Sequence, residues 1–189
     1  VRMLRAVKYA ASSGFKIPFL LRRKITSSAH LLSPVSPSRL TEELLKIINS
    51  GQAYEIVSSA IPLRLFMYLQ PAASALLAEK EGFCASYMES LKELDELHHR
   101  DPAARLGDKL VYLIRDFIKL LANWELEAAA KTSAAELYKF AWKECRSFVL
   151  PMNPQRSELE YAVRFCLKEF GISVRPPKKK KSPQRTAAV

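Results

Sequence analysis

The chain has 189 residues, of which 49% are hydrophobic and 26% are charged, a composition typical of a globular protein with one sizeable core. The net charge is +11, but residues 1–32 and 175–189 carry no acid, whereas residues 33–174 carry 17 basic and 19 acidic residues. This distribution argues against a basic, nucleic-acid-binding body and assigns the positive charge to two tails. Three cysteines without CxxC spacing argue against a disulfide framework or a zinc site, and no apolar run reaches the roughly 20 residues that span a bilayer.

Residues 1–32 have the composition of a targeting segment. On a helical wheel the apolar side chains near the start gather opposite the basic ones, and the first acid of the chain is Glu42. Such amphipathic, acid-free segments are typical of mitochondrial transit peptides, and the arrangement around Arg23 fits a two-step processing pattern that predicts a mature start near Ser33. The alternative is a basic N-terminal segment with no targeting role. The predicted targeting residues are Arg2, Arg5, Lys8, Arg22, Arg23, Ile25 and Ser28.

A linker rich in serine and proline follows, and then a series of short helices. Apolar periodicity and stop signals predict helices over residues 39–49, 53–60, 63–70 and 72–81, and a longer amphipathic helix over 83–99. Helices of two or three turns are marginal alone, so they must pack against a longer element.

That longer element is predicted over residues 102–131. Asp101 is a candidate N-cap and Pro102 suits the first helical position. Two adjacent apolar stripes leave only a narrow polar edge, so this helix should be surrounded by other elements. The stripes consist of Leu106, Leu110, Leu113, Phe117, Leu120 and Trp124, and of Val111, Ile114, Ile118 and Leu121.

Two more helices complete the prediction. Ser133 and Glu136 form a capping box at the start of one, and Gly171 is placed to close the last. No useful β-alternation is present. The sequence therefore predicts an all-α, irregular bundle of about seven or eight helices around the central helix 102–131. This domain would span residues 33–174, between a transit peptide and a disordered basic tail, residues 175–189.

Few residues suggest chemistry. His98 and His99 lie beside Asp95, where a metal or general base can be imagined, but a polar helix end is the simpler interpretation. The sequence contains no HExxH, GxSxG or glycine-rich phosphate loop. We therefore expect no catalytic, cofactor-binding or metal-binding residues, and a protein that is not an enzyme.

The lysine run near the C-terminus leaves three alternatives. Lys178, Lys179, Lys180 and Lys181 are a candidate nuclear import signal, a candidate phosphate-binding arm for RNA or anionic lipid, or a solvated tail without a partner.

Together these features predict a non-enzymatic accessory, scaffold or assembly subunit of a mitochondrial complex, either respiratory chain, ATP synthase or mitoribosome. Its partners would be proteins of that complex, in the matrix or on the matrix side of the inner membrane. The alternative is an RNA-associated protein, mitoribosomal or nuclear, that uses the lysine tail.

Overall fold

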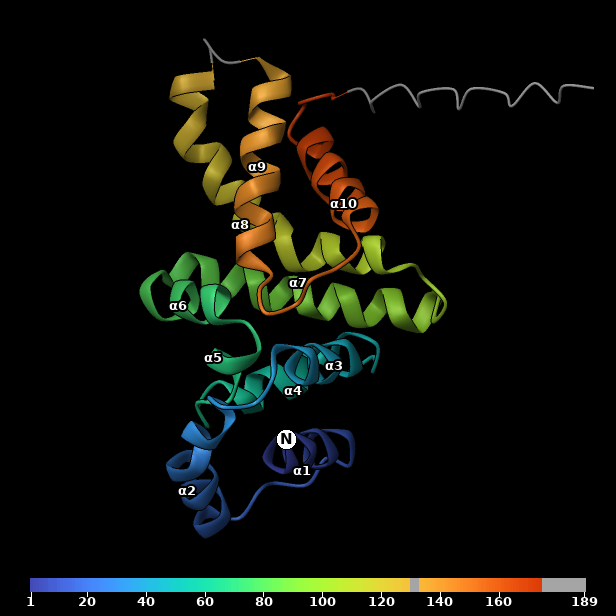
Figure 1. The fold of residues 1–189 in the computed structure, drawn as a ribbon. Helices are drawn as coiled ribbons and strands as arrows, with labels where there is room; N and C mark the ends of the chain where they lie inside the picture. The colour runs from blue at the N-terminus through green and yellow to red at the C-terminus, as the bar shows by residue number, and fades with distance from the viewer. Residues whose placement is uncertain (130–132, 175–189) are drawn as a thin grey trace, which may run out of the picture.

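The structure, a computed structural model, describes residues 1–129 and 133–174. Within these residues it holds ten α-helices, one short 3-10 helix and no strand, which confirms the all-α prediction (Figure 1). Residues 175–189, and with them Lys178 to Lys181, lie outside the described residues. The helices are α1 (Arg2–Ser12), α2 (Phe19–Ser28), η1 (Ala29–Leu32), α3 (Pro37–Ile48), α4 (Ala53–Ala60), α5 (Phe66–Leu69), α6 (Pro71–Glu79), α7 (Glu81–Arg100), α8 (Leu106–Ala129), α9 (Ala134–Phe148) and α10 (Arg156–Glu169).

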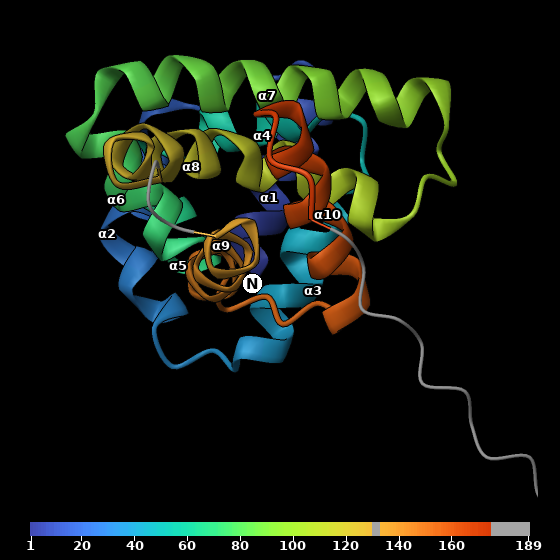
Figure 2. The ribbon, with the colours of Figure 1, turned by 90° about the horizontal axis from the view of Figure 1, so that it is seen from above.

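The predicted central helix is α8. It packs most extensively against α10 and α7, and Figure 2 shows α7 and α8 running side by side. Leu110, Leu113 and Ile114 are at most 1% exposed, so the apolar stripes face the core as expected. The side chain of Trp124 lies outside the described part.

The start of α8 differs from the prediction. Asp101 is not its N-cap, because the helix begins only at Leu106 and Asp101 stands at the end of α7 instead. The Asp101 carboxylate accepts a hydrogen bond from the backbone N–H of Ala103 (3.1 Å). Asp101 therefore stabilises the turn between α7 and α8. Aspartate commonly forms this kind of local hydrogen bond with the backbone two residues on.

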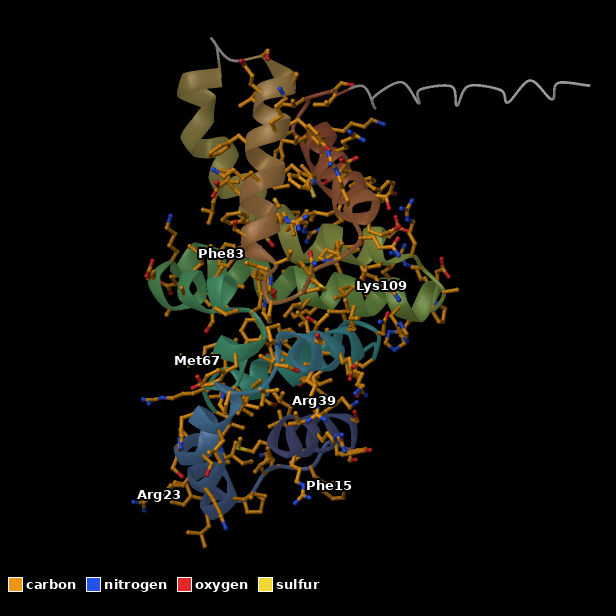
Figure 3. The ribbon with its side chains drawn as sticks, in the orientation of Figure 1. Phe15, Arg23, Arg39, Met67, Phe83 and Lys109 are labelled. Atoms are coloured by element: carbon orange, nitrogen blue, oxygen red, sulfur yellow. The ribbon has the colours of Figure 1, made fainter. Side chains whose placement is uncertain are left out.

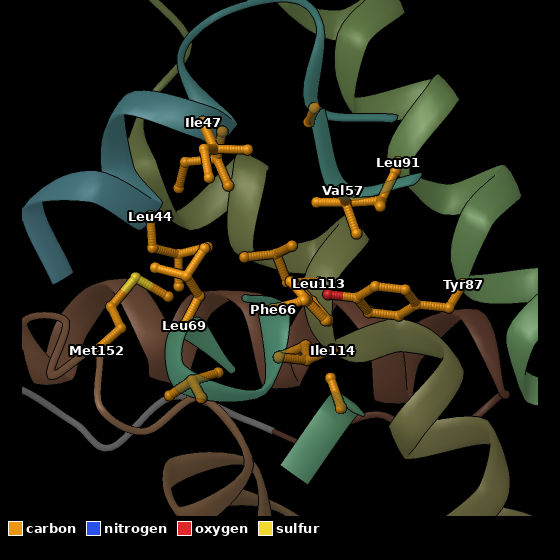
Figure 4. Close-up of a cluster of buried hydrophobic side chains, with 14 of the residues drawn as sticks. Leu44, Ile47, Val57, Phe66, Leu69, Tyr87, Leu91, Leu113, Ile114 and Met152 are labelled. Atoms are coloured by element: carbon orange, nitrogen blue, oxygen red, sulfur yellow. The ribbon is translucent and has the colours of Figure 1, made fainter. Parts of the chain in front are cut away.

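The short helices share one core with α8. Figure 4 shows side chains from α3, α4, α5, α7 and α8 meeting around Phe66 and Tyr87, with Met152 joining from the connection between α9 and α10. Tyr87 is fully buried and donates its hydroxyl hydrogen to Oε1 of Gln70 (2.8 Å). This bond offsets the cost of burying the two polar groups.

Residues 1–32 are part of the fold. Helix α1 packs on α4 through Leu4 and Val7, which are 4% and 1% exposed, and α2 and η1 add Ile25, Ala29 and Leu32 to the same core. The buried face of α1 is the apolar side of the predicted wheel. In Figure 1 these N-terminal helices form one end of the molecule, and α9 and α10 form the other.

Helix α4 is held from both sides. Helix α1 lies on one side, while Asp95 of α7 accepts hydrogen bonds from the backbone N–H groups of Ala53 (2.6 Å) and Tyr54 (2.9 Å). A carboxylate at a helix N-terminus satisfies free donors and favours the helix dipole. The segment that follows α4 is thereby fixed relative to the core.

The remaining helix ends agree with the sequence. Ser133 and Glu136 form the predicted capping box, and Gly171 closes α10 with φ at 78° while Ile172 N–H donates to the Leu167 carbonyl (2.9 Å). No helix in the described part of the chain is both long and apolar enough to cross a membrane.

Candidate nucleic-acid interface

The surface of α1, α2 and the start of α3 carries only positive charge. No aspartate or glutamate occurs before Glu42, so of these cations only Arg39 has an acidic residue within four positions in the sequence. None of them forms an ion pair within the described residues, whereas Arg105, Arg115 and Arg164, outside this surface, do. The unpaired cations of this surface are Arg2, Arg5, Lys8, Lys16, Arg22, Arg23, Lys24 and Arg39.

Exposed aromatic rings lie among these cations. Phe15 is 77% exposed and Phe19 is 75% exposed. Phe15 follows the turn that ends α1, where Gly14 adopts φ of 66° and the Phe15 N–H donates to the Ala10 carbonyl (3.0 Å). Figure 3 shows Phe15 and Arg23 extending outward from the end of the molecule formed by α1 and α2.

These rings differ from the aromatic side chains of the opposite end. Tyr138, Trp142 and Tyr161 each lie within 6 Å of an arginine guanidinium. No such cation, and no second ring, contacts Phe15 or Phe19 in the described part of the chain. The faces of Phe15 and Phe19 are therefore available for stacking.

Two adjoining hollows form a groove beside these rings. One, of about 450 Å³, lies between the α1–α2 turn and α4, with Glu55 as its single acidic lining residue. The other, of about 580 Å³, lies between α2 and the loop after α4 and has no acidic lining residue. The hollows share Arg22, Pro62 and Leu63 as lining residues, so they lie next to each other.

The loop after α4 has an unusual backbone at Arg64. Its φ is 58°, the left-handed region, and it is the one non-glycine residue with positive φ in the described residues. Arg64 lines the acid-free hollow with its exposed side chain. A non-glycine residue in this conformation is uncommon and costs free energy, so its position is notable.

The predicted targeting residues fall into four groups. Arg22 and Arg23 line the groove, whereas Ile25 is buried in the core. Arg2 and Ser28 border a further hollow of about 420 Å³ between α1 and α2. Arg5 and Lys8 lie on α1 and line none of these hollows. The targeting role of these residues stays a prediction.

His98 and His99, the histidines considered as a metal or general-base site, make structural contacts at the end of α7. His99 Nδ1 lies 2.6 Å from the Asp95 carbonyl, and the rings of both His98 and His99 pack against Gly51. Burial raises the pKa of Asp95 although its carboxylate accepts the two hydrogen bonds at the start of α4. In the described part of the chain no three His, Cys, Asp or Glu side chains are placed to hold a metal ion.

The surface thus combines the two features that single-stranded nucleic acids require. Unpaired guanidinium and ammonium groups attract phosphates, and exposed rings offer stacking faces to bases. The positive charge lies on the folded N-terminal helices, whereas the sequence had predicted residues 1–32 to be a transit peptide that is removed.

Comparison with known proteins agrees with this surface. Residues 14–77 match a family described as the probable RNA- and SrmB-binding site of polymerase A. This match contains Phe15, Phe19, Arg22 and Arg64, and it indicates an RNA-binding domain.

The curated relatives are bacterial polymerases by name. Poly(A) polymerase I of Escherichia coli is 38% identical over 160 residues, which cover 80% of this chain and 34% of the relative. Poly(A) polymerase I of Haemophilus influenzae is 33% identical over 129 residues, 65% of this chain and 28% of the relative. The chain therefore spans about a third of the length of these relatives. No solved structure matches the chain significantly.

These comparisons correct the predicted function. A scaffold or assembly subunit of a mitochondrial complex is wrong, because both the family match and the relatives indicate RNA binding, which was the alternative. The prediction was wrong because it treated residues 1–32 as separate from the folded domain and counted only the charges of residues 33–174. Six of the seven basic residues in 1–32 lie on helices α1 and α2 and the seventh, Lys16, lies between these helices, so the folded chain has a basic face although residues 33–174 alone carry no net positive charge.

The prediction that the protein is not an enzyme is also contradicted. The relatives carry the name of an enzyme, poly(A) polymerase I, and this chain resembles the RNA-binding region of that family. The chain covers about a third of such a relative, so the absence of a catalytic motif from these 189 residues does not exclude an enzyme.

Proposed function

We propose that this chain binds the RNA substrate of a poly(A) polymerase, through the surface formed by α1, α2 and the loop after α4. The observation that carries the proposal is the coincidence of unpaired cations and exposed phenylalanines within the segment that matches the RNA-binding family. The match to the relative covers 34% of its length, so the proposal concerns RNA binding and not the polymerisation reaction.

The first test removes two charges from the groove. In the double variant Arg22→Ala, Arg23→Ala, two guanidinium groups that line the hollow are lost without a change in the core. We expect affinity for a fluorescent single-stranded RNA to fall roughly tenfold, and the slope of log affinity against log salt to fall by about 1.4.

The matched control removes two charges elsewhere. Lys139→Ala, Lys143→Ala removes exposed cations from α9, at the opposite end of the molecule. Fluorescence anisotropy across a salt series should then give nearly wild-type affinity and slope. Equal losses in both double variants would show that net charge, and not this surface, accounts for binding.

A second test addresses the polymerase. In a complete enzyme that contains this chain, the groove variant should raise KM for RNA and leave kcat nearly unchanged, because the groove binds substrate away from the reacting atoms. A loss confined to kcat would contradict a role in RNA binding.

A protein partner is a second candidate on the same helices. Leu20 and Leu31 are 78% and 57% exposed, and the matching family is described as binding SrmB as well as RNA. Exposed apolar side chains suit a protein contact better than a phosphate contact. Leu20→Ser, Leu31→Ser should weaken binding of SrmB in a pull-down assay while RNA affinity stays unchanged.

A further inference from the structure

The acid-free hollow between α2 and the loop after α4 has the lining of a nucleotide site. Three arginines, Arg22, Arg23 and Arg64, are among its lining residues together with Phe19. Its volume of about 580 Å³ lies in the range of about 300–1,000 Å³ typical of small-ligand pockets. Guanidinium groups bind phosphate oxygens in pairs of hydrogen bonds, and a phenylalanine face stacks on a base.

The loop holds Arg64 in its strained conformation from both sides. The Arg64 N–H donates to the Ile61 carbonyl (3.0 Å), and the Leu65 N–H donates to the Ala60 carbonyl (3.1 Å). Leu63 and Leu65 are buried at 3% and 0% exposure, so the neighbours of Arg64 are anchored in the core. The backbone is fixed, and the exposed side chain is the part of Arg64 that is free to bind.

Glycine would be the favourable residue for this backbone. It adopts positive φ without the steric conflict that a β-carbon causes, and the chain does use glycine at three other positive-φ positions, Gly14, Gly51 and Gly171. A strained residue that persists in a binding site indicates that its side chain serves the site. The positive φ at position 64 thus favours glycine, but the residue present there is arginine.

We propose that the hollow binds one nucleotide of the RNA, its phosphate between Arg22 and Arg64 and its base on Phe19, and that Arg64 is retained at the expense of stability for this contact. The inference rests on the proposed RNA-binding function and assigns a site and a residue within it. It requires that replacing Arg64 by glycine change stability and affinity in opposite directions.

The experiment uses Arg64→Gly in the whole chain. We expect the melting temperature to rise by about 2 °C, because the strain is relieved. We also expect affinity for a single-stranded RNA of about 15 nucleotides to fall roughly tenfold, with the salt slope reduced by about 0.7.

Two further variants separate strain from charge. Arg64→Ala keeps the β-carbon and loses the charge, so it should lose affinity as the glycine variant does without gaining its rise in melting temperature. Arg100→Ala removes one exposed arginine at the end of α7, outside the groove, and should leave affinity and slope near wild type.

The outcomes distinguish the two proposals. A wild-type chain that binds no RNA would overturn the proposed function itself. If the wild-type chain binds RNA and the Arg64→Gly variant binds with the same affinity as the wild type or as Arg100→Ala, the proposed nucleotide site is wrong while the proposed function stands. An Arg64→Gly variant with a lowered melting temperature would overturn the claim that the arginine is retained against stability.

Discussion

Arg115 shows how this molecule treats a cation that has a structural role. Its guanidinium donates to both carboxylate oxygens of Glu93 (2.5 and 2.6 Å) and to the Ser90 hydroxyl (2.8 Å), which in turn donates to Asp116. These bonds join α7 to α8 and satisfy Ser90 and Asp116, which are buried. Within the described residues, the arginines of the proposed RNA-binding surface form no such ion pair, which separates cations that hold the fold from cations that are available for binding.

The Glu93 to Arg115 pair predicts a pH dependence. Hydrogen bonding with Arg115 lowers the pKa of Glu93 below its usual value of 4.5. A carboxyl group whose pKa is lower in the folded state than in the unfolded state stabilises the fold at pH values above its unfolded-state pKa. This contribution is lost as the pH falls through the pKa of the folded state. We expect Glu93→Gln to melt below the wild type at neutral pH, with the difference shrinking as the pH falls below the usual carboxyl value of 4.5. Since Glu93 is 40% exposed, the difference should be small. A gap that widens in acid would contradict this assignment.

At this scale the sequence predicts local bonds well and distant ones poorly. The capping box of Ser133 and the closing Gly171 follow from residues within a few positions of each other. Asp95, in contrast, caps a helix more than 40 residues earlier in the chain, which no local pattern indicates. Arg64 gave no signal, because an arginine is not expected where the backbone favours glycine.

At the scale of elements, α8 determines the packing of the others. Leu113 is 1% exposed and lies among side chains from several helices in Figure 4. Leu113→Ala should cost about 3 kcal/mol of unfolding free energy, because it removes buried methyl groups and leaves a cavity. Denaturant unfolding measures this cost. Leu31→Ala, at a 57% exposed position, should cost less than about 0.5 kcal/mol, and equal costs would refute the central position of α8.

The boundaries of the helices were predictable where stop residues mark them. The prediction for residues 53–60 coincides with α4, which is followed closely by Pro62. Helix α5 is shorter than predicted, since residues 63–65 form a turn that buries Leu63 and Leu65. The groove depends on the shape of this turn and on how close the turn lies to α2. Both are features of the tertiary structure, so the periodicity of the sequence could not predict the candidate site.

At the scale of the whole molecule, the N-terminal helices and the body share one core. A chain lacking residues 1–32 would lose five buried apolar side chains, those of Leu4, Val7, Ile25, Ala29 and Leu32. We expect this truncation to lower unfolding free energy by several kcal/mol and to abolish RNA binding. Circular dichroism with heating measures the first effect. A truncated chain that melts like the wild type would mean that α1 and α2 contribute little to the core.

The mitochondrial location predicted from residues 1–32 is a separate proposal with its own test. Fused to a fluorescent protein in eukaryotic cells, this segment should direct the reporter to mitochondria if the address is functional. A reporter that stays outside the organelle would contradict the address. Cleavage near Ser33 would also remove α1 and α2, so the N-terminus of the mature protein decides whether the proposed RNA-binding surface persists.

The absence of acids before Glu42 has a consequence for selectivity. A face with many free cations and little negative charge attracts any polyanion, and phosphate contacts carry no information about base sequence. Such a protein would hold messenger, ribosomal and transfer RNA with comparable strength. Choice among transcripts must then come from features other than charge, such as a free single-stranded end that can enter the groove, or from a partner that delivers the transcript.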